Sequence, residues 1–185
     1  PPIAAQTSFS VSLDPAMAPG DGAGVSGRLV VYLIREGSSL PGNAQPGDGP
    51  FFDDPQPMFG VDVAGVKASV PIVVDDGATS FPIVLSRLEP GTYRVQAVLD
   101  TQRLDSSWRR EPGNFYSQVA TLEVRPAGAA PETTKLVLAK QTEARAGAPV
   151  VHDGKTIAET FTVRSELLSA FRGREVYLRA GVVFP

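Results

Sequence analysis

The chain has 185 residues, among them 18 Gly, 17 Pro, one His and no Cys. These counts exclude a disulfide framework, a thiolate metal site, a cysteine nucleophile and a multi-histidine metal centre. The 17 basic and 20 acidic side chains are interspersed and give a net charge of −3, so we expect no nucleic-acid surface. No apolar run approaches the roughly 20 residues that cross a bilayer, so we expect no membrane span.

Strand patterns follow one another from the start of the chain. Residues 8–13 alternate apolar and polar side chains, which predicts a half-buried strand, and the continuous apolar stretch 27–35 predicts a central strand buried on both faces. Further strands are expected at 58–63, 69–74, 80–85, 93–99, 118–124 and 135–139. Turn residues such as Pro-Gly and Asp-Gly separate them. This pattern indicates an antiparallel β-sandwich rather than βαβ units.

One turn makes the prediction more specific. A Pro-Gly pair precedes Tyr93, and the residues Tyr93, Val95, Ala97 and Leu99 then alternate on one face. In immunoglobulin-type sandwiches a tyrosine near the start of strand F bonds back to the preceding corner, two residues before a core position. The alternative is an ordinary hairpin, because any hairpin can hold such a turn. We predict a tyrosine corner at Tyr93 and an immunoglobulin-like sandwich.

The C-terminal part has a different organisation. Residues 141–156 are rich in Ala and Gly with mixed charge, which indicates a linker. Strands are expected at 158–163 and 176–184, with a short helical turn between them that Ser165 caps and Gly173 ends. The last strand is still apolar where the sequence stops. We therefore expect residues 157–185 to be a two-stranded extension that begins a further domain.

Several stretches resemble a known family. They are the tail, which runs from Ser165 through Leu167, Leu168, Phe171, Gly173 and Arg174 to residues 176–185, together with residues 58–63, 90–93 and 112–117. The tail resembles the segment that leads into the catalytic domain of bacterial esterase-D-like, enterochelin-esterase-like α/β-hydrolases. The other stretches resemble the immunoglobulin-like domain that precedes it in long members. The resemblance implies an exported bacterial protein, secreted or periplasmic, whose partner is a hydrolase catalytic domain in the same or a cleaved chain.

The catalytic motif of that family is missing. Its nucleophile lies in a Gly-x-Ser-x-Gly elbow, and this pattern occurs nowhere in the 185 residues. The resemblance therefore implies no catalytic residue and no cofactor here, and an active site elsewhere in the parent polypeptide. The chain opens without Met or a signal-peptide pattern, which fits a mature secreted product and a trimmed chain equally well.

Other candidate sites are weaker. His152 beside Asp153 could act as a base, but a triad draws its members from separate segments, so a solvated turn is the alternative we favour. Asp48, Asp53 and Asp54 lie in a loop rich in Gly and Pro, and residues 75–76 are a second acidic pair. Such loops could supply oxygens to calcium, but they lack the spacing of a calcium loop and are more often solvated turns.

The loop after the Tyr93 strand is the main surface candidate. Trp108, Arg109, Arg110, Phe115 and Tyr116 offer stacking faces and cationic side chains that suit a sugar, a carboxylated ligand or a docked domain. The alternative is that Trp108 and Phe115 pack this loop onto the sandwich. The pair Phe51 and Phe52 has the same ambiguity.

These observations combine into one prediction. We expect an all-β chain with a disordered N-terminus (1–6), an immunoglobulin-like antiparallel β-sandwich (7–140), a linker (141–156) and a C-terminal β-strand extension (157–185). Its function is expected to be that of a non-catalytic N-terminal domain which packs on a hydrolase domain and shapes substrate access or assembly. The alternative is a free-standing carbohydrate- or protein-binding module. Self-association is a third expectation, since the last strand could join a neighbour's sheet.

Overall fold

The protein divides into two compact units. The structure, a computed structural model, describes residues 7–20, 22–102, 107–126, 128–143, 150–152, 154–173 and 175–184. The N-terminal unit is Pro1–Glu143 and the C-terminal unit is Ala144–Pro185. The predicted disorder at residues 1–6 lies outside the described residues. No helix of the described part is both long and apolar enough to cross a membrane.

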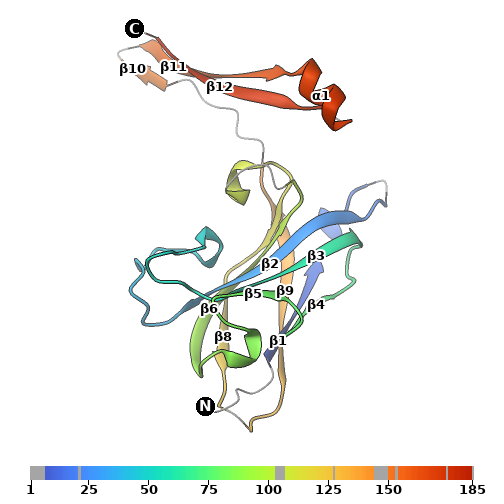
Figure 1. The fold of residues 1–185 in the computed structure, drawn as a ribbon, viewed down its shortest axis with the longest axis vertical. Helices are drawn as coiled ribbons and strands as arrows, with labels where there is room; N and C mark the ends of the chain where they lie inside the picture. The colour runs from blue at the N-terminus through green and yellow to red at the C-terminus, as the bar shows by residue number, and fades with distance from the viewer. Residues whose placement is uncertain are drawn as a thin grey trace. The chain divides into compact units, whose positions relative to one another are not determined.

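The N-terminal unit is a single curled β-sheet (Figure 1). Its nine strands in the described residues are β1 (Thr7–Leu13), β2 (Val25–Arg35), β3 (Met58–Val66), β4 (Ile72–Val74), β5 (Thr79–Phe81), β6 (Gly91–Asp100), β7 (Phe115–Ser117), β8 (Ala120–Val124) and β9 (Glu132–Gln141). Their order is β4-β1-β9-β7-β6-β2-β3-β5, with β8 also paired to β6. Four 3₁₀ turns connect them: η1 (Pro15–Met17), η2 (Pro46–Asp48), η3 (Leu85–Arg87) and η4 (Trp108–Arg110).

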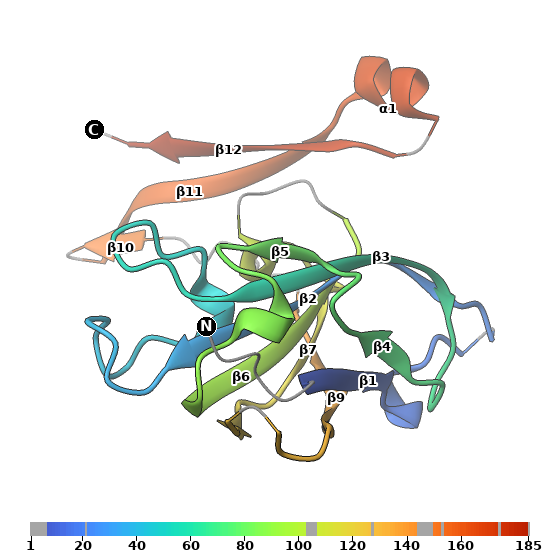
Figure 2. The same ribbon diagram turned by 60° about the horizontal axis from the view of Figure 1, so that its bottom comes forward.

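The sheet curls until its distant strands meet across the core. Phe9 on β1 and Phe59 on β3 stack with ring centroids 6.4 Å apart, although four strands separate β1 from β3 in the sheet order. Leu29, Val31 and Leu33 of β2 belong to the same buried cluster. Figure 2 shows β1, β4 and β9 on one side of this core and β2 and β3 on the other. The predicted all-β, sandwich-like fold with a C-terminal β extension is therefore confirmed.

The predicted tyrosine corner is present. The Tyr93 hydroxyl donates a hydrogen bond of 2.9 Å to the Glu89 carbonyl at the corner that precedes β6. Burial raises the pKa of the Tyr93 phenol, so the hydroxyl keeps the proton that it donates. In the sheet the pairing of β1 with β9 is parallel, which departs from the antiparallel neighbours that the sequence predicts.

Several predicted strand limits were wrong for identifiable reasons. Residues 69–74 form a strand only from Ile72, because Ser69 has a φ of 61° and belongs to a turn. Residues 80–85 form a strand only as far as Phe81, because Pro82 has no N–H for the ladder. The central strand β2 buries the face of Leu29, Val31 and Leu33 fully, whereas on the other face only Ile34 is buried.

The C-terminal unit is a three-stranded antiparallel sheet with a short helix. Its elements are β10 (Val150–His152), β11 (Lys155–Arg164), α1 (Glu166–Arg172) and β12 (Tyr177–Val183), in the sheet order β10-β11-β12. The predicted caps of α1 are confirmed, because the Ser165 side chain accepts from the Leu168 N–H and Gly173 ends the helix at a φ of 64°. The predicted linker 141–156 was wrong in part, because β10 and the start of β11 fall within it.

Candidate functional site

The predicted aromatic loop is locked onto the sheet by Trp108. The Trp108 ring is only 7% exposed, and its Nε1–H donates a hydrogen bond of 2.6 Å to the carbonyl of Gly47 in η2. The two residues are 61 positions apart in the chain. The Tyr116 ring lies 5.1 Å from the Trp108 ring, centroid to centroid, at a tilt of 51°. Trp108 therefore joins the loop before β7 to the long loop between β2 and β3.

Arg109 closes the same junction from outside. Its guanidinium lies 4.3 Å from the centre of the Trp108 ring, a cation–π contact. Its Nε and Nη2 both reach Asp48 Oδ1, at 2.9 and 2.8 Å. Asp48 in turn accepts the Gln45 N–H through its other oxygen, at 2.9 Å. The carboxylate of Asp48 is thereby shared between its own turn and Arg109.

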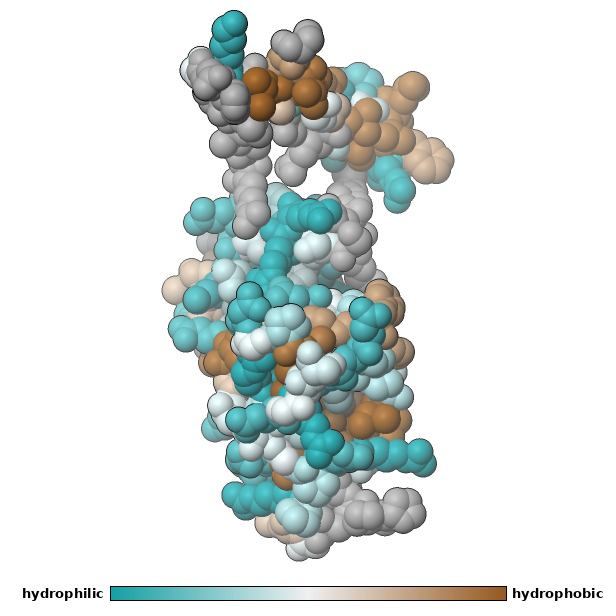
Figure 3. Space-filling model, turned by 90° about the vertical axis from the view of Figure 1, so that its left-hand side faces the viewer, coloured by the Kyte–Doolittle hydropathy of each residue, from teal (hydrophilic) through white to brown (hydrophobic). Residues whose placement is uncertain are grey.

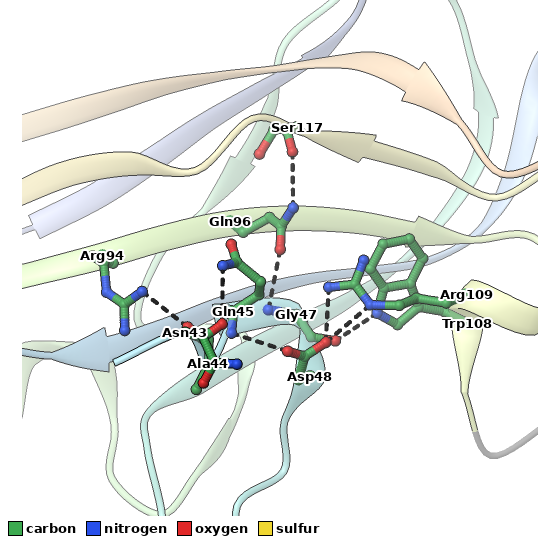
Figure 4. Close-up of polar contacts among 10 residues, drawn as sticks. All are labelled: Asn43, Ala44, Gln45, Gly47, Asp48, Arg94, Gln96, Trp108, Arg109 and Ser117. Atoms are coloured by element: carbon green, nitrogen blue, oxygen red, sulfur yellow. Dashed lines mark hydrogen bonds and ion pairs between the residues drawn. The ribbon is translucent and has the colours of Figure 1, made fainter. Parts of the chain in front are cut away.

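Beneath η2 a buried glutamine ties the loop to the sheet (Figure 4). The Gln96 side chain on β6 accepts from the Gly47 N–H at 3.1 Å and donates to the Ser117 carbonyl at 3.0 Å. Arg94, two residues earlier on β6, donates to the Ala44 carbonyl at 2.9 Å. One strand therefore presents two side chains that hold the backbone of the β2–β3 loop.

A second buried amide holds the other end of the aromatic loop. Asn114 is 0% exposed and donates through Nδ2 to the Trp108 carbonyl at 3.0 Å. Its Oδ1 accepts from the Thr101 N–H at 2.7 Å and from the Thr101 hydroxyl at 3.0 Å. The Asn114 backbone N–H and carbonyl both bond with Thr142, just after β9. Asn114 thus fixes both ends of the described loop.

The five predicted site residues differ in how deeply they are buried. Trp108 and Phe115 are buried, Arg109 and Tyr116 are half-buried, and Arg110 is exposed. Phe115 and Tyr116 belong to β7 and not to a loop, which corrects the sequence assignment. The Trp108 ring is buried and carries Arg109 on one face, so it offers no free platform to a sugar ring. The geometry supports the packing interpretation of this loop.

The residues that position the loop were not found by sequence reasoning. Gln96, Asn114, Ser117 and Gly47 are polar or small residues whose role depends on partners far along the chain. Gln96 lies among the apolar residues of a strand, and Asn114 follows a Pro-Gly turn. Polar residues are common at both kinds of position, so neither residue stands out in the sequence. A buried amide has no signature in a single sequence.

An open groove of about 1710 Å³ lies at the tyrosine-corner end of the N-terminal unit. Arg35, Asp54, Arg87 and Tyr93 are among its lining residues, and Arg35 forms an ion pair with Glu89 at the rim. Hydrogen bonds from the Ser39 side chain and backbone lower the pKa of the Asp54 carboxyl, so Asp54 is charged near neutral pH. These charged groups hold the loops that form the groove walls.

The candidate acidic loops hold their own turns. Asp54 accepts from the Ser39 N–H and hydroxyl at 2.8 and 2.7 Å, Asp75 accepts from the Gly77 N–H, and Asp76 accepts from the Ser86 N–H. Asp53 lines the groove. Within the described ranges, no three His, Cys, Asp or Glu side chains are placed to hold a metal ion. The backbone of His152 ends β10, and Asp153 lies outside the described residues.

The C-terminal unit presents an apolar sheet face. In the β11–β12 register Phe161 pairs with Ala180 and Val163 with Leu178, and antiparallel partners share a face. The exposed apolar residues of this face include Ile157, Phe161, Val163, Leu178, Ala180 and Val182, alongside the partly buried Glu159. Figure 3 shows hydrophobic side chains, in brown, at the surface of this unit. Only Ser169 is buried among its described side chains, and these form no core of their own.

The helix of the same unit adds to the apolar surface. Leu167 and Phe171 of α1 are 85% and 82% exposed. Ser169 on the same helix accepts the Val176 N–H at 2.9 Å, which ties α1 to the start of β12. The apolar side chains of α1 and of the sheet are therefore held on one connected framework.

Comparison with known proteins places the chain in no family. No family model, no curated protein and no solved structure matches it.

Proposed function

We propose that this chain is a non-catalytic N-terminal part of an exported bacterial esterase-like hydrolase, which packs on the catalytic domain and shapes substrate access or assembly. The observation that carries the proposal is the apolar face of the β11–β12 sheet, with Phe161, Val163 and Leu178 exposed. A soluble protein rarely leaves such a set of neighbouring apolar side chains in water unless another body covers it.

The size of the C-terminal unit supports the same proposal. A three-stranded sheet with one seven-residue helix, in which Ser169 is the only buried one among the described side chains, buries too little apolar surface to be stable by itself. The other face is more polar, because it holds Thr162 and Arg164 beside Tyr177 and Val183. The more apolar face is therefore the one suited to a covering layer.

The N-terminal unit supports a structural rather than a chemical role. Its buried polar side chains Gln96, Asn114 and Ser117 bond to backbone groups that hold loops in place. These amides and hydroxyls position chain segments and do not converge on an open cavity. The resemblance of the tail to the entry segment of esterase-like hydrolases supports a hydrolase catalytic domain as the partner.

The first test is enzymatic. The purified chain is incubated with p-nitrophenyl butyrate and compared with its His152→Ala variant. We expect both to release nitrophenol at the rate of buffer alone. Turnover by the wild-type chain that disappears in the variant would overturn the proposal, as would a stop codon directly after the codon for Pro185 in the gene. A reading frame that continues into a Gly-x-Ser-x-Gly segment is the expected result.

The second test uses a matched pair of substitutions in the whole polypeptide. Phe161→Asp places a charge on the apolar face, and Thr162→Asp places the same charge on the other face. With the catalytic domain present, Phe161→Asp is expected to lower the thermal midpoint and the ester turnover, because a covered charge is costly. Thr162→Asp is expected to leave both unchanged. Equal effects of the two variants would show that the apolar face is not covered.

A further inference from the structure

The free edge of β12 has a defined hydrogen-bonding pattern. The Phe184 N–H donates to the Ile157 carbonyl at 2.9 Å, and the Val176 carbonyl accepts the Ser165 N–H at 2.8 Å. Even-numbered residues at both ends of β12 therefore face β11. Because strand residues alternate, the backbone groups of Tyr177, Arg179, Gly181 and Val183 point away from β11. Within the described residues, no strand pairs with β12 on that side.

This edge lacks the features that usually block pairing with another chain. The seven residues of β12 contain no Pro and no Lys, and their register with β11 has no bulge. Arg179 is the only charged residue among them. A long, regular and mostly apolar edge is a template for a further strand.

We propose that a second copy of this chain occupies the edge, with the two β12 strands antiparallel about a twofold axis at Ala180. Antiparallel pairing places the outward groups of one strand opposite those of the other, so odd-numbered residues must face odd-numbered residues. The register centred on Ala180 meets this condition and pairs all seven residues. Tyr177 then lies opposite the partner's Val183, and Ala180 lies opposite its own copy.

The same register keeps the apolar side chains together. Leu178 lies opposite the partner's Val182, and both belong to the apolar face of the sheet. The two three-stranded sheets become one six-stranded sheet with a continuous apolar face. This inference concerns the edge of β12 and the proposed function concerns its face, so each stands or falls on its own test.

A matched pair of substitutions at Gly181 tests the edge. The Gly181 N–H points outward and a Cβ at this position meets no atom within 4 Å, so Gly181→Ala fits the strand. An edge strand also tolerates Pro where the N–H points away from its neighbour, so both variants keep the bonds to β11. Only Pro removes the outward N–H and fills the edge. By light scattering after size exclusion we expect twice the 19.5 kDa chain mass for the wild type and for Gly181→Ala, and the single mass for Gly181→Pro.

Charges at Ala180 test the register. Ala180 is exposed and faces itself across the proposed axis, so Ala180→Lys and Ala180→Glu each place like charges opposite each other. Each variant alone is expected to weaken the dimer about tenfold or more, and an equimolar mixture to restore it as a heterodimer. Far-UV circular dichroism checks that every variant is folded. A monomeric wild type at high micromolar concentration, a dimeric Gly181→Pro, or a mixture that does not restore the dimer would overturn the proposal.

Discussion

Replacing Trp108 by Ala tests whether the aromatic loop is part of the fold or a binding surface. Removing a buried Trp side chain costs about 3–5 kcal/mol of unfolding free energy. The Trp108 ring is 7% exposed and its Nε1–H holds the Gly47 carbonyl, so we expect Trp108→Ala to reach that range. The total free energy of unfolding of a domain is roughly 5–15 kcal/mol. The substitution would therefore remove a large share of the stability of the N-terminal unit.

A smaller substitution separates the hydrogen bond from the packing. Trp108→Phe keeps most of the ring and leaves the Gly47 carbonyl without its donor, which costs about 1–3 kcal/mol for a buried group. Phe52→Ala is the matched control, because Phe52 is an aromatic residue of the β2–β3 loop that is 82% exposed. Its removal should change the unfolding free energy by less than about 0.5 kcal/mol.

The assay is urea unfolding followed by far-UV circular dichroism for all four proteins. Trp108 is the only tryptophan of the chain, so its fluorescence reports in addition on the loop of the wild type and Phe52→Ala. The midpoints should fall in the order wild type and Phe52→Ala, then Trp108→Phe, then Trp108→Ala, with unchanged slopes. If the unfolding free energy of Trp108→Ala lies within about 0.5 kcal/mol of the wild-type value, the loop is not held by this ring. The binding interpretation of Trp108 would then regain its basis.

Three further predictions use the same unfolding assay. Tyr93→Phe removes the hydroxyl that bonds the Glu89 carbonyl and should cost about 0.5–1.5 kcal/mol; no loss would argue against a working tyrosine corner. The pKa of Asp54 lies below its usual 3.8, so the charged carboxylate stabilises the fold above that pH. The difference in unfolding free energy between the wild type and Asp54→Asn should therefore shrink as the pH falls through the lowered pKa. A difference that does not change with pH would contradict this. Gly47→Ala places a Cβ 2.7 Å from Gln96 Oε1, which is held by its own bonds, and should lower the midpoint by more than Gly181→Ala does.

The sequence predicted the fold where the pattern was local. The alternation around Phe9 predicted β1, because each second side chain of a half-buried strand enters the core. The turn before Tyr93 predicted the corner, because its hydrogen bond spans four residues. The cap residues Ser165 and Gly173 predicted α1 for the same reason. In each case the partners lie a few positions apart, within reach of a pattern.

The candidate site was harder to predict from the sequence, because its contacts join residues far apart in the chain. Trp108 was correctly singled out, but its partner Gly47 lies 61 residues away, and a single sequence gives no register between two loops. The strand β7 was missed because Phe115–Ser117 has three residues, too few to show a period. Asn114 carries no pattern that singles it out, yet its buried side chain bonds to Trp108 and Thr101. Such roles depend on the curl of the sheet.

The two units differ in how much of their apolar surface they bury themselves, and this difference is the reason that we expect a partner at the C-terminal unit. In the N-terminal unit the aromatic residues that first suggested a ligand, Trp108 and Phe115, are buried by the unit itself. In the C-terminal unit Phe161 and Leu178 are held in a regular sheet and stay exposed. Apolar residues fixed in an ordered sheet cannot collapse onto one another, so another body must cover them to remove them from water. A partner is therefore expected on the C-terminal sheet, and the aromatic loop serves the fold.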